Sequence, residues 1–145
     1  MKLTINQSLD QEETEIIINY SVIDQRLQHL IDYIRQYSFS IQGILDNSVF
    51  QIPLEKIMYI DTADKKTFLY CTQKVYQAKE TLSTLEKVLL KTPFVRISKS
   101  CIANSTYLKC VKPIANHHLE AMLKNGEKLI VSRSYIKDLK EKLKN

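Results

Sequence analysis

Short apolar segments alternate with polar residues from residue 44 to residue 131, and this pattern limits the folds open to the chain. Alternation with a period of two is typical of strands that bury one face. In residues 44–80, turn-forming residues separate the segments at a spacing of about ten residues, which is typical of an antiparallel meander. We expect strands within these ranges: Ile44–Ile52, broken by a tight turn at Asp46-Asn47-Ser48, then Ile57–Ile60, Thr67–Thr72, Val75–Lys79, Leu119–Leu123 and Lys128–Val131. The last two are expected to form a hairpin through the turn Lys124-Asn125-Gly126-Glu127, since Asn-Gly is a strong hairpin signal.

Three stretches have helical spacing instead. The first covers residues 22–37, with Ser21 as its expected cap and Asp24 three residues later. The second starts after Thr81 and stops by Pro93, and the third follows Ser132 or Ser134. A strand is expected before the first helix, at Thr14–Tyr20, and a loop after it, marked by Ser38, Ser40 and Gly43.

The composition is that of a folded chain with one core. The chain has 145 residues, of which 44% are hydrophobic and 26% charged. No apolar run approaches the ~20 residues of a membrane-spanning helix, and the first residues lack the apolar segment of a signal peptide. We therefore expect a cytoplasmic protein. The odd number of cysteines (Cys71, Cys101, Cys110) indicates reduced thiols rather than a disulfide framework.

Charge is unevenly distributed along the chain. Residues 1–50 carry three basic and seven acidic residues, whereas residues 51–145 carry eighteen basic and nine acidic ones; net charges of −4 and +9 give the overall +5. This asymmetry favours an anionic partner for the second part, nucleic acid before membrane. A lysine-rich surface without such a partner is the alternative.

Catalysis has little support in the sequence. Cys101 with His117 or His118 would be a cysteine–histidine pair, but no orienting carboxylate or amide accompanies it. Adjacent histidines in a strand point to opposite faces, so a turn or strand-entry role fits them better than a metal site. The two glycines, Gly43 and Gly126, cannot form a phosphate-binding loop. We expect no enzyme, no cofactor, no metal and no small-molecule substrate.

The stretch Phe94–Lys112 carries the most distinctive polar residues. Lys99 lies two residues beyond Ile97 and two before Cys101, so strict alternation would bury its ammonium, at several kcal/mol. The chain must therefore bend at Ser98–Ser100 and present Lys99 outward. Arg96 faces away from the core without a bend and is expected to hold a phosphate or a local carboxylate.

Basic residues gather at the ends of expected strands: Lys65-Lys66, Arg96 with Lys99, and Arg133 with Lys137. Such side chains neutralise phosphates and read base edges. Few aromatic residues accompany them, which disfavours single-strand stacking. The helices are separated by strands, which disfavours a helix-turn-helix. Double-stranded DNA read by loops or strands is the remaining interpretation.

Four motifs, in order, resemble the LytTR-type DNA-binding domains of bacterial regulators. They are IPLEKIMYIDTADKKTFLYCT, TLSTLEKVL, FVRISKSCIAN (the family's F-x-R-x-x-x-S-x-x-x-N) and NGEKLIVSRSYIKDLKEKL, within about residues 44–144. The resemblance implies a mostly β domain whose loops enter the major groove. The residues that it implies for base reading are Lys66, Thr67, Ser98, Lys99 and Arg133.

Two positions depart from the family pattern. Asp61 stands where the family often has Glu, and Ser98 where it often has His, which puts base reading by Ser98 in doubt. Asn104 matches the family, and its place at a strand end predicts bonds to the backbone.

The segment before the domain is too short for the receiver that precedes most LytTR domains. The chain resembles instead the small stand-alone regulators that carry a strand and a helix there and are commonly encoded beside a small membrane protein. We expect Ile23, Leu27, Leu30 and Ile34 of this helix to pack on the domain or on another subunit.

The sequence thus predicts an α+β protein: a strand–helix extension (residues 1–43) for dimerisation or partner docking, then a β-rich LytTR-type domain (residues 44–145) of short antiparallel strands with two short helices. The expected function is sequence-specific binding of double-stranded DNA as a transcriptional regulator, as a homodimer on repeated half-sites. Its predicted site is Lys65, Lys66, Thr67, Arg96, Ser98, Lys99, Arg133 and Lys137. The alternative is a non-DNA interaction module, or an anti-regulator docked to a small membrane protein.

Overall fold

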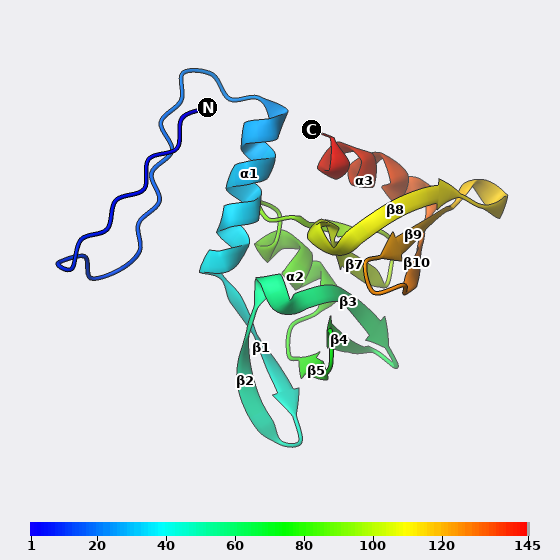
Figure 1. Ribbon diagram of the computed structural model, residues 1–145. Coiled ribbons are helices and arrows are strands. Elements are labelled where there is room, and N and C mark those ends of the chain that lie inside the picture. Colours follow the sequence, from blue (N-terminus) through cyan, green and yellow to red (C-terminus); the bar gives the residue numbers. More distant parts are fainter. Residues whose placement is uncertain (145) are drawn as a thin grey trace.

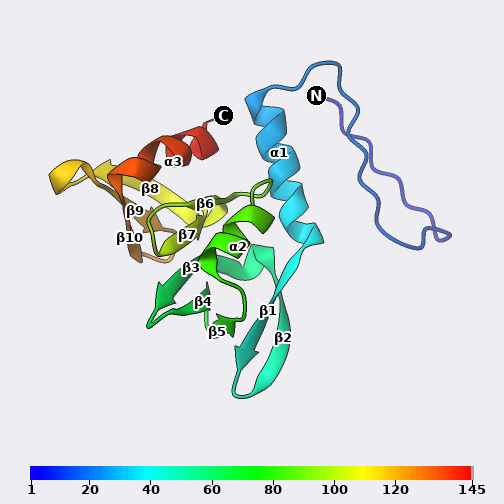
Figure 2. The same ribbon diagram turned by 180° about the vertical axis from the view of Figure 1, so that it is seen from behind.

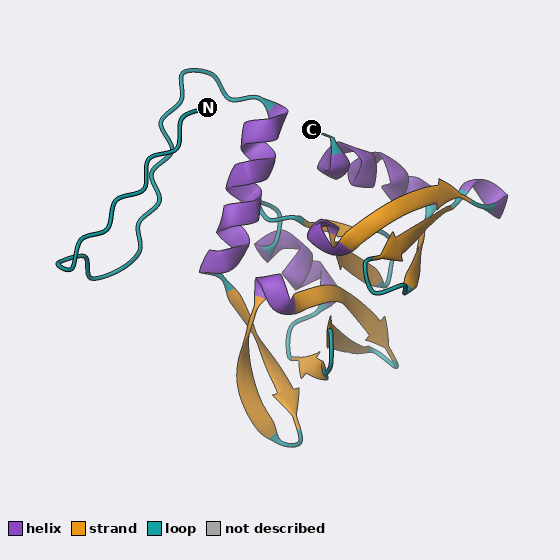
Figure 3. Cartoon of the chain, in the orientation of Figure 1, coloured by secondary structure: helices purple, strands orange, loops and turns teal. Residues whose placement is uncertain are grey.

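The computed structural model describes residues 1–144 and confirms an α+β fold built mostly of antiparallel strands (Figures 1 and 3). Its helices are α1 (Gln25–Arg35), α2 (Leu82–Val88) and α3 (Ile136–Leu143). Its strands are β1 (Ser40–Leu45), β2 (Ser48–Pro53), β3 (Ile57–Ala63), β4 (Lys66–Cys71), β5 (Val75–Ala78), β6 (Phe94–Arg96), β7 (Cys101–Asn104), β8 (Leu108–Pro113), β9 (Leu119–Leu123) and β10 (Lys128–Val131).

The strands form two sheets. Seven of them follow the order β2-β1-β5-β4-β3-β7-β6, and the other three the order β10-β9-β8. The expected meander over residues 44–80 is therefore only partly right: β3, β4 and β5 pair in sequence, but β5 then pairs with β1. A Cβ atom at Gly43 would lie 2.6 Å from Cβ of Tyr76, so the β1–β5 pairing requires glycine there.

Two tight hairpin turns have both central residues in the left-handed region. Asp46 and Asn47 have φ of 51° and 65°, and Asp64 and Lys65 have 52° and 64°. Such turns match the twist of antiparallel strands. The first confirms the turn predicted at Asp46-Asn47-Ser48. The second is much shorter than the polar excursion that separated the expected strands, because β3 continues to Ala63 and β4 starts at Lys66.

Each face of the seven-stranded sheet contributes to its own core. In β7 the side chain of Ile102 joins one cluster, while Cys101 and Ala103 join the other. The Ile102 cluster is covered by α2, through Leu82, Leu85 and Leu89. The Cys101 cluster is covered by the three-stranded sheet and α3, through Leu119, Ala121, Leu123, Val131 and Leu139. The sheet is therefore sandwiched at β3 and β7, which fixes the ends of these strands.

The segment before α1 differs from expectation. Residues 14–20 form no strand, because none of the described segments pairs with them, and the chain up to Asp24 runs away from the domain (Figures 1 and 2). Helix α1 begins one turn later than predicted: Asp24, not Ser21, caps it by accepting a 2.8 Å hydrogen bond from the Leu27 N–H. The loop expected at residues 38–43 was wrong, because β1 already begins at Ser40.

Helix α2 follows the prediction at its start, where the Thr81 hydroxyl accepts from the Thr84 N–H at 3.2 Å. It stops at Val88, before Pro93. The predicted cap of α3 was wrong: the side chains of Ser132 and Ser134 cap nothing, and a 3₁₀ turn at Arg133–Tyr135 leads directly into the helix. Within residues 1–144, every helix is too short or too polar to cross a bilayer.

Candidate nucleic-acid interface

Three loop-like segments carry the basic residues singled out in the sequence. The β3–β4 turn presents Lys65 and Lys66, both exposed. The connection between β6 and β7 presents Lys99, also exposed. The 3₁₀ turn after β10 presents Arg133, with Lys137 about one helical turn further on.

Backbone hydrogen bonds join these three segments. The Thr62 N–H of β3 donates to the Ser100 carbonyl at 2.9 Å, just before the turn with Lys65. The Ser132 N–H donates to the Ile97 carbonyl at 2.9 Å, which places Arg133 beside the same connection. The segment Ile97–Ser100 thus lies between the other two, and all three meet along one edge of the sandwich.

The connection itself has the bend predicted from burial. Ile97 is fully buried, and both its N–H and that of Ser98 donate to the Cys101 carbonyl, which closes a tight loop. The Ser98 hydroxyl accepts from the Ser100 N–H at 3.2 Å. Lys99 stands at the tip with its side chain exposed, because the loop interrupts the alternation that would have buried it.

The guanidinium group of Arg96 stabilises this loop through hydrogen bonds. Its Nε donates to the Ser98 carbonyl at 2.8 Å, a second nitrogen donates to the Lys99 carbonyl, and the third lies 2.9 Å from the carboxylate of Glu86 on α2. The Arg96 side chain is only 15% exposed, against 40% for Glu86. A planar guanidinium can bond three acceptors at once in this way, whereas a lysine cannot. The local carboxylate expected for Arg96 is therefore present.

Two other predicted residues offer less surface. Thr67 is 6% exposed, in β4, so its side chain packs inside the protein. Ser98 is half-buried, and its hydroxyl takes part in the bonds within the loop, including a 3.4 Å contact with the Ser100 hydroxyl. Lys65, Lys66, Lys99, Arg133 and Lys137 remain as exposed cations at this edge.

Asn104 has the structural role predicted for it. Fully buried at the end of β7, it donates to the Ile57 carbonyl at 2.9 Å and accepts from the N–H and hydroxyl of Thr106 at 3.1 and 2.8 Å. Its amide also contacts Gln36, just after α1, at 3.4 Å. Asn104 therefore ties β3, β7 and the N-terminal helix together.

The residues considered for catalysis differ in their surroundings: Cys101 is buried, whereas His117 is exposed. Burial raises the pKa of the Cys101 thiol far above its ordinary value, and the nearby Asp61 raises it further, so the thiol stays protonated. His117 lies exposed in a turn, and His118 Nδ1 contacts the Asn116 carbonyl at 2.9 Å. Their place at the entry to β9 confirms the turn role. No cluster of metal-ligating side chains occurs in residues 1–144.

A comparison with protein-family models matches residues 47–144 to the LytTR DNA-binding domain. The chain belongs to the LytTR family. Similar proteins include a sensory transduction protein LytT of Enterococcus faecalis, 34% identical over 71% of this chain and 42% of that protein. A transcriptional regulatory protein LytR of Staphylococcus aureus is 33% identical over 66% of this chain and 39% of that protein. The chain thus spans less than half the length of these relatives.

Among solved structures, a LytTR domain from Bacillus cereus has the same fold. The TM-score is 0.68 at 26% sequence identity, and the match covers 74% of this chain and 98% of that one. The four sequence motifs fall on the elements that build the basic edge: the β3–β4 hairpin, α2, the β6–β7 loop and the β9–β10 hairpin with α3.

The sequence did not predict two residues at the edge where the three basic segments meet. Glu86, which orients Arg96, is the acidic residue of the T-L-x-x-L-E motif, but its partner lies ten positions away on another element. Thr62 joins the edge through its N–H, and its hydroxyl lies 3.5 Å from the Ser100 carbonyl. Only the motif glutamate gave a signal in the sequence, because backbone bonds leave no residue preference behind.

Proposed function

We propose that this protein is a transcriptional regulator that binds double-stranded DNA in a sequence-specific manner, through the loops of its basic edge in the major groove. Lys99, Arg133, Lys65, Lys66 and Lys137 are the contacts, either to phosphates or to base edges. The observation that carries the proposal is the pair of backbone bonds, Thr62 to Ser100 and Ser132 to Ile97, which hold three cationic segments of a LytTR domain together.

The eight predicted residues divide into contacts and supports under this proposal. Arg96 acts through the loop that it holds rather than on DNA, because each of its three nitrogens already donates to a protein acceptor. The buried side chain of Thr67 supports the packing of the β3–β4 hairpin. Ser98 contributes by keeping the loop folded, and base contact by its hydroxyl requires one of its local bonds to open.

The relatives named LytT and LytR support a regulatory role for the whole protein, which we place in the cytoplasm with DNA. We propose further that it acts as a homodimer on repeated half-sites, because two linked domains bind two sites far more tightly than one. Residues 1–43 lie outside the matched range, residues 47–144, and are proposed to provide the link.

Selection of bound duplexes from a random pool, followed by binding measurements on the selected sequence, tests the proposal. The enriched motif should bind with an affinity that falls steeply with salt, and Arg133→Ala should weaken it by about 1–3 kcal/mol while the protein stays folded. A matched control is Lys74→Ala, an exposed lysine between β4 and β5, away from the three segments.

One alternative has an observation in its favour. The apolar side chains of the N-terminal segment are exposed, including Ile16 (61%) and Ile17 (70%), as in an interaction module that docks on another protein. Such a module, or an anti-regulator bound to a small membrane protein, would enrich no duplex and would show no steep salt dependence for DNA. That result would replace DNA reading by this second function.

A further inference from the structure

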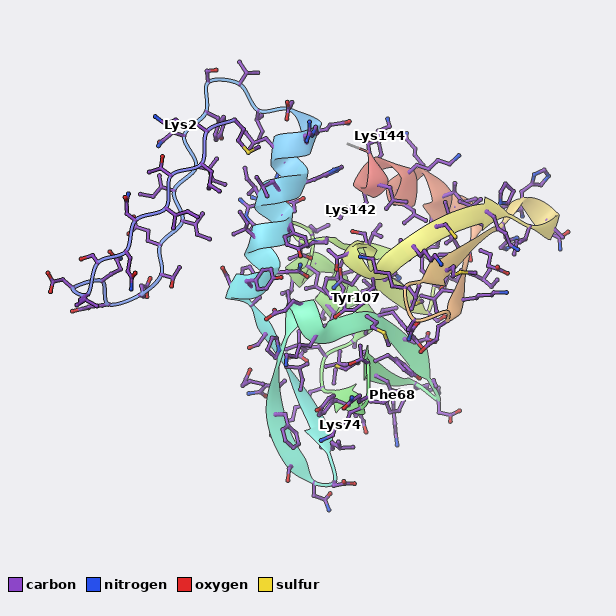
Figure 4. All side chains as sticks on the ribbon, in the orientation of Figure 1. Lys2, Phe68, Lys74, Tyr107, Lys142 and Lys144 are labelled. Atoms are coloured by element: carbon purple, nitrogen blue, oxygen red, sulfur yellow. The ribbon has the colours of Figure 1, made fainter. Side chains whose placement is uncertain are left out.

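Helix α1 lies against the domain with its polar side. Gln28, Asp32 and Gln36 recur every four residues on that side. Asp32 is 8% exposed and Gln36 1%. Gln28 donates to Asp32 at 2.9 Å, and Gln36 contacts Asn104 of the domain. A cleft of about 470 Å³ between α1 and the domain is lined by polar side chains of α1 and by Lys142 of α3. Figure 4 labels Lys142, on the C-terminal helix near α1.

The apolar side of α1 faces away from the domain. We call Ile23, Leu27, Leu30, Ile31 and Ile34 the outer stripe. Ile23 precedes the cap Asp24; at 3.6 residues per turn, the centre of the other four lies about 150° from that of the polar side. Ile23 is 43% exposed and Leu30 38%, while Leu27, Ile31 and Ile34 are half-buried; none of the five belongs to a buried core cluster. The expectation was that these residues pack on the domain or on another subunit. The structure places them in neither core of the domain, so packing on another subunit stays a prediction.

An amphipathic helix in this orientation needs another partner. Exposed apolar residues continue the stripe into the preceding segment, among them Tyr20 (56%) and Val22 (80%). Binding to an anionic bilayer does not fit, since membrane-surface helices carry Lys and Arg on the polar face. Here the polar face is buried against the domain, and residues 1–50 have a net charge of −4.

The charges beside the stripe favour a second copy as the occupant. Each also has a partner in its own chain, since Asp24 accepts from the Leu27 N–H and Arg35 lies 3.6 Å from Asp32. Asp24 and Arg35 lie about three whole turns apart, at opposite ends of α1 but on the same flank of the stripe. In an antiparallel pair of α1 helices related by a two-fold axis, Asp24 of each copy faces Arg35 of the other. A parallel pair would place the two flanks on opposite sides of the interface, where Asp24 and Arg35 of different copies could not pair. The stripe is thus complementary to itself in one orientation.

We propose that the outer stripe is a self-association surface on which α1 of a second copy docks antiparallel. This deepens the proposed function, since it names the surface that would join two LytTR domains. The polar side of α1, anchored by Gln36 to Asn104, then fixes the direction in which each domain leaves the dimer.

The first test measures mass without DNA. The wild-type full chain should have twice the 16.9 kDa monomer mass by sedimentation equilibrium at micromolar concentration. Leu27→Glu/Leu30→Glu should raise the dissociation constant on the order of 100-fold, since two central apolar contacts are lost. The control Val88→Glu/Leu90→Glu changes two apolar residues on or near α2 that are more exposed, at 60% and 67%, and should leave the mass unchanged.

The second test measures orientation by disulfide formation in a Cys110→Ser background, which removes the exposed cysteine. Chains carrying Ile23→Cys should cross-link with chains carrying Ile34→Cys, because antiparallel docking brings these positions together. Neither chain should cross-link with itself, since like positions would lie on the order of 15 Å apart. Self-linkage of each chain would overturn the antiparallel arrangement.

A monomeric wild type, or a dimer that the Leu27/Leu30 variant does not weaken, would overturn the surface altogether. These outcomes are separate from the DNA proposal. The Leu27→Glu/Leu30→Glu monomer should still bind a duplex with a single half-site, with the wild-type single-site affinity. A wild type that dimerises through the stripe but binds no duplex would contradict the DNA proposal and support the self-association surface.

Discussion

Replacement of Arg96 tests whether this residue stabilises the Ile97–Ser100 loop or contacts DNA directly. In Arg96→Ala, the Ser98 and Lys99 carbonyls lose their donors, and Glu86 loses its cation. In Arg96→Lys, the ammonium can still reach Glu86, but it cannot bond both carbonyls and the carboxylate in one plane. The two variants should therefore differ in stability more than in DNA binding.

The magnitude follows from the burial of the group. Hydrogen bonds to charged groups contribute about 1.5–3 kcal/mol each when buried. Glu86 is 40% exposed, and the loop carbonyls lie near solvent, so water offsets much of their loss. We expect Arg96→Ala to lower the free energy of unfolding by about 1–3 kcal/mol and Arg96→Lys by less. Glu86→Gln should change it by no more than about 1 kcal/mol.

The assay combines urea unfolding with DNA binding over a series of salt concentrations. Both Arg96 variants should lose affinity for the selected duplex because Lys99 is no longer held in place. The slope of log affinity against log salt should stay within error of the wild type, since no phosphate contact is removed. A slope flattened by about 0.9 in a variant of unchanged stability would show that Arg96 neutralises a phosphate, and would refute the supporting role.

Two further predictions concern stability. Asn104→Ala should lower the free energy of unfolding, measured by urea titration, by about 2–4 kcal/mol, because the Ile57 carbonyl and the Thr106 N–H lose their hydrogen-bond partner. A decrease below about 0.5 kcal/mol would contradict the structural role of Asn104. The pKa of Cys101 is raised in the folded state, so stability should be complete below the ordinary thiol pKa of 9.0 and fall as pH rises above it, when only the unfolded thiol ionises. Cys101→Ala should lose less stability over the same pH interval, and equal losses would remove Cys101 as the cause.

Local sequence patterns predicted much of the sandwich. The Asp46-Asn47 turn, the Lys124–Glu127 hairpin and the Thr81 cap all rest on residues adjacent in sequence. The bend at Lys99 followed from the energy of burying an ammonium. In each case the residues carry the preference themselves, so a single sequence is enough.

Contacts between residues far apart in the sequence were not predicted. The β-branched residues of Thr14–Tyr20 favour a strand, but a strand needs a partner, and none of the described segments supplies one. The β1–β5 pairing joins residues more than thirty positions apart, as Gly43 opposite Ala78 shows. The orientation of α1 was missed because an amphipathic pattern does not say which side meets the domain, and buried Gln36 and Asp32 settle it.

Charge and motif identified the candidate residues, but they did not indicate which of these residues are exposed and which already bond to protein groups. Lys65, Lys66, Lys99, Arg133 and Lys137 lie exposed on joined segments, whereas Thr67 is buried and Arg96 is occupied by protein acceptors. A run of basic residues gives no sign of which cation has a protein partner. That partner, Glu86, comes from another element.

Binding of Lys99→Ala to the selected duplex, measured across salt concentrations, tests the central claim most directly. Lys99 is exposed at the loop tip, so the variant should keep the wild-type melting temperature and lose affinity. If Lys99 contacts a phosphate, the salt slope should flatten by about 0.9; if it contacts a base, discrimination at one position should relax instead. A folded Lys99→Ala protein that binds the duplex with wild-type affinity and specificity would contradict the claim that this loop reads DNA.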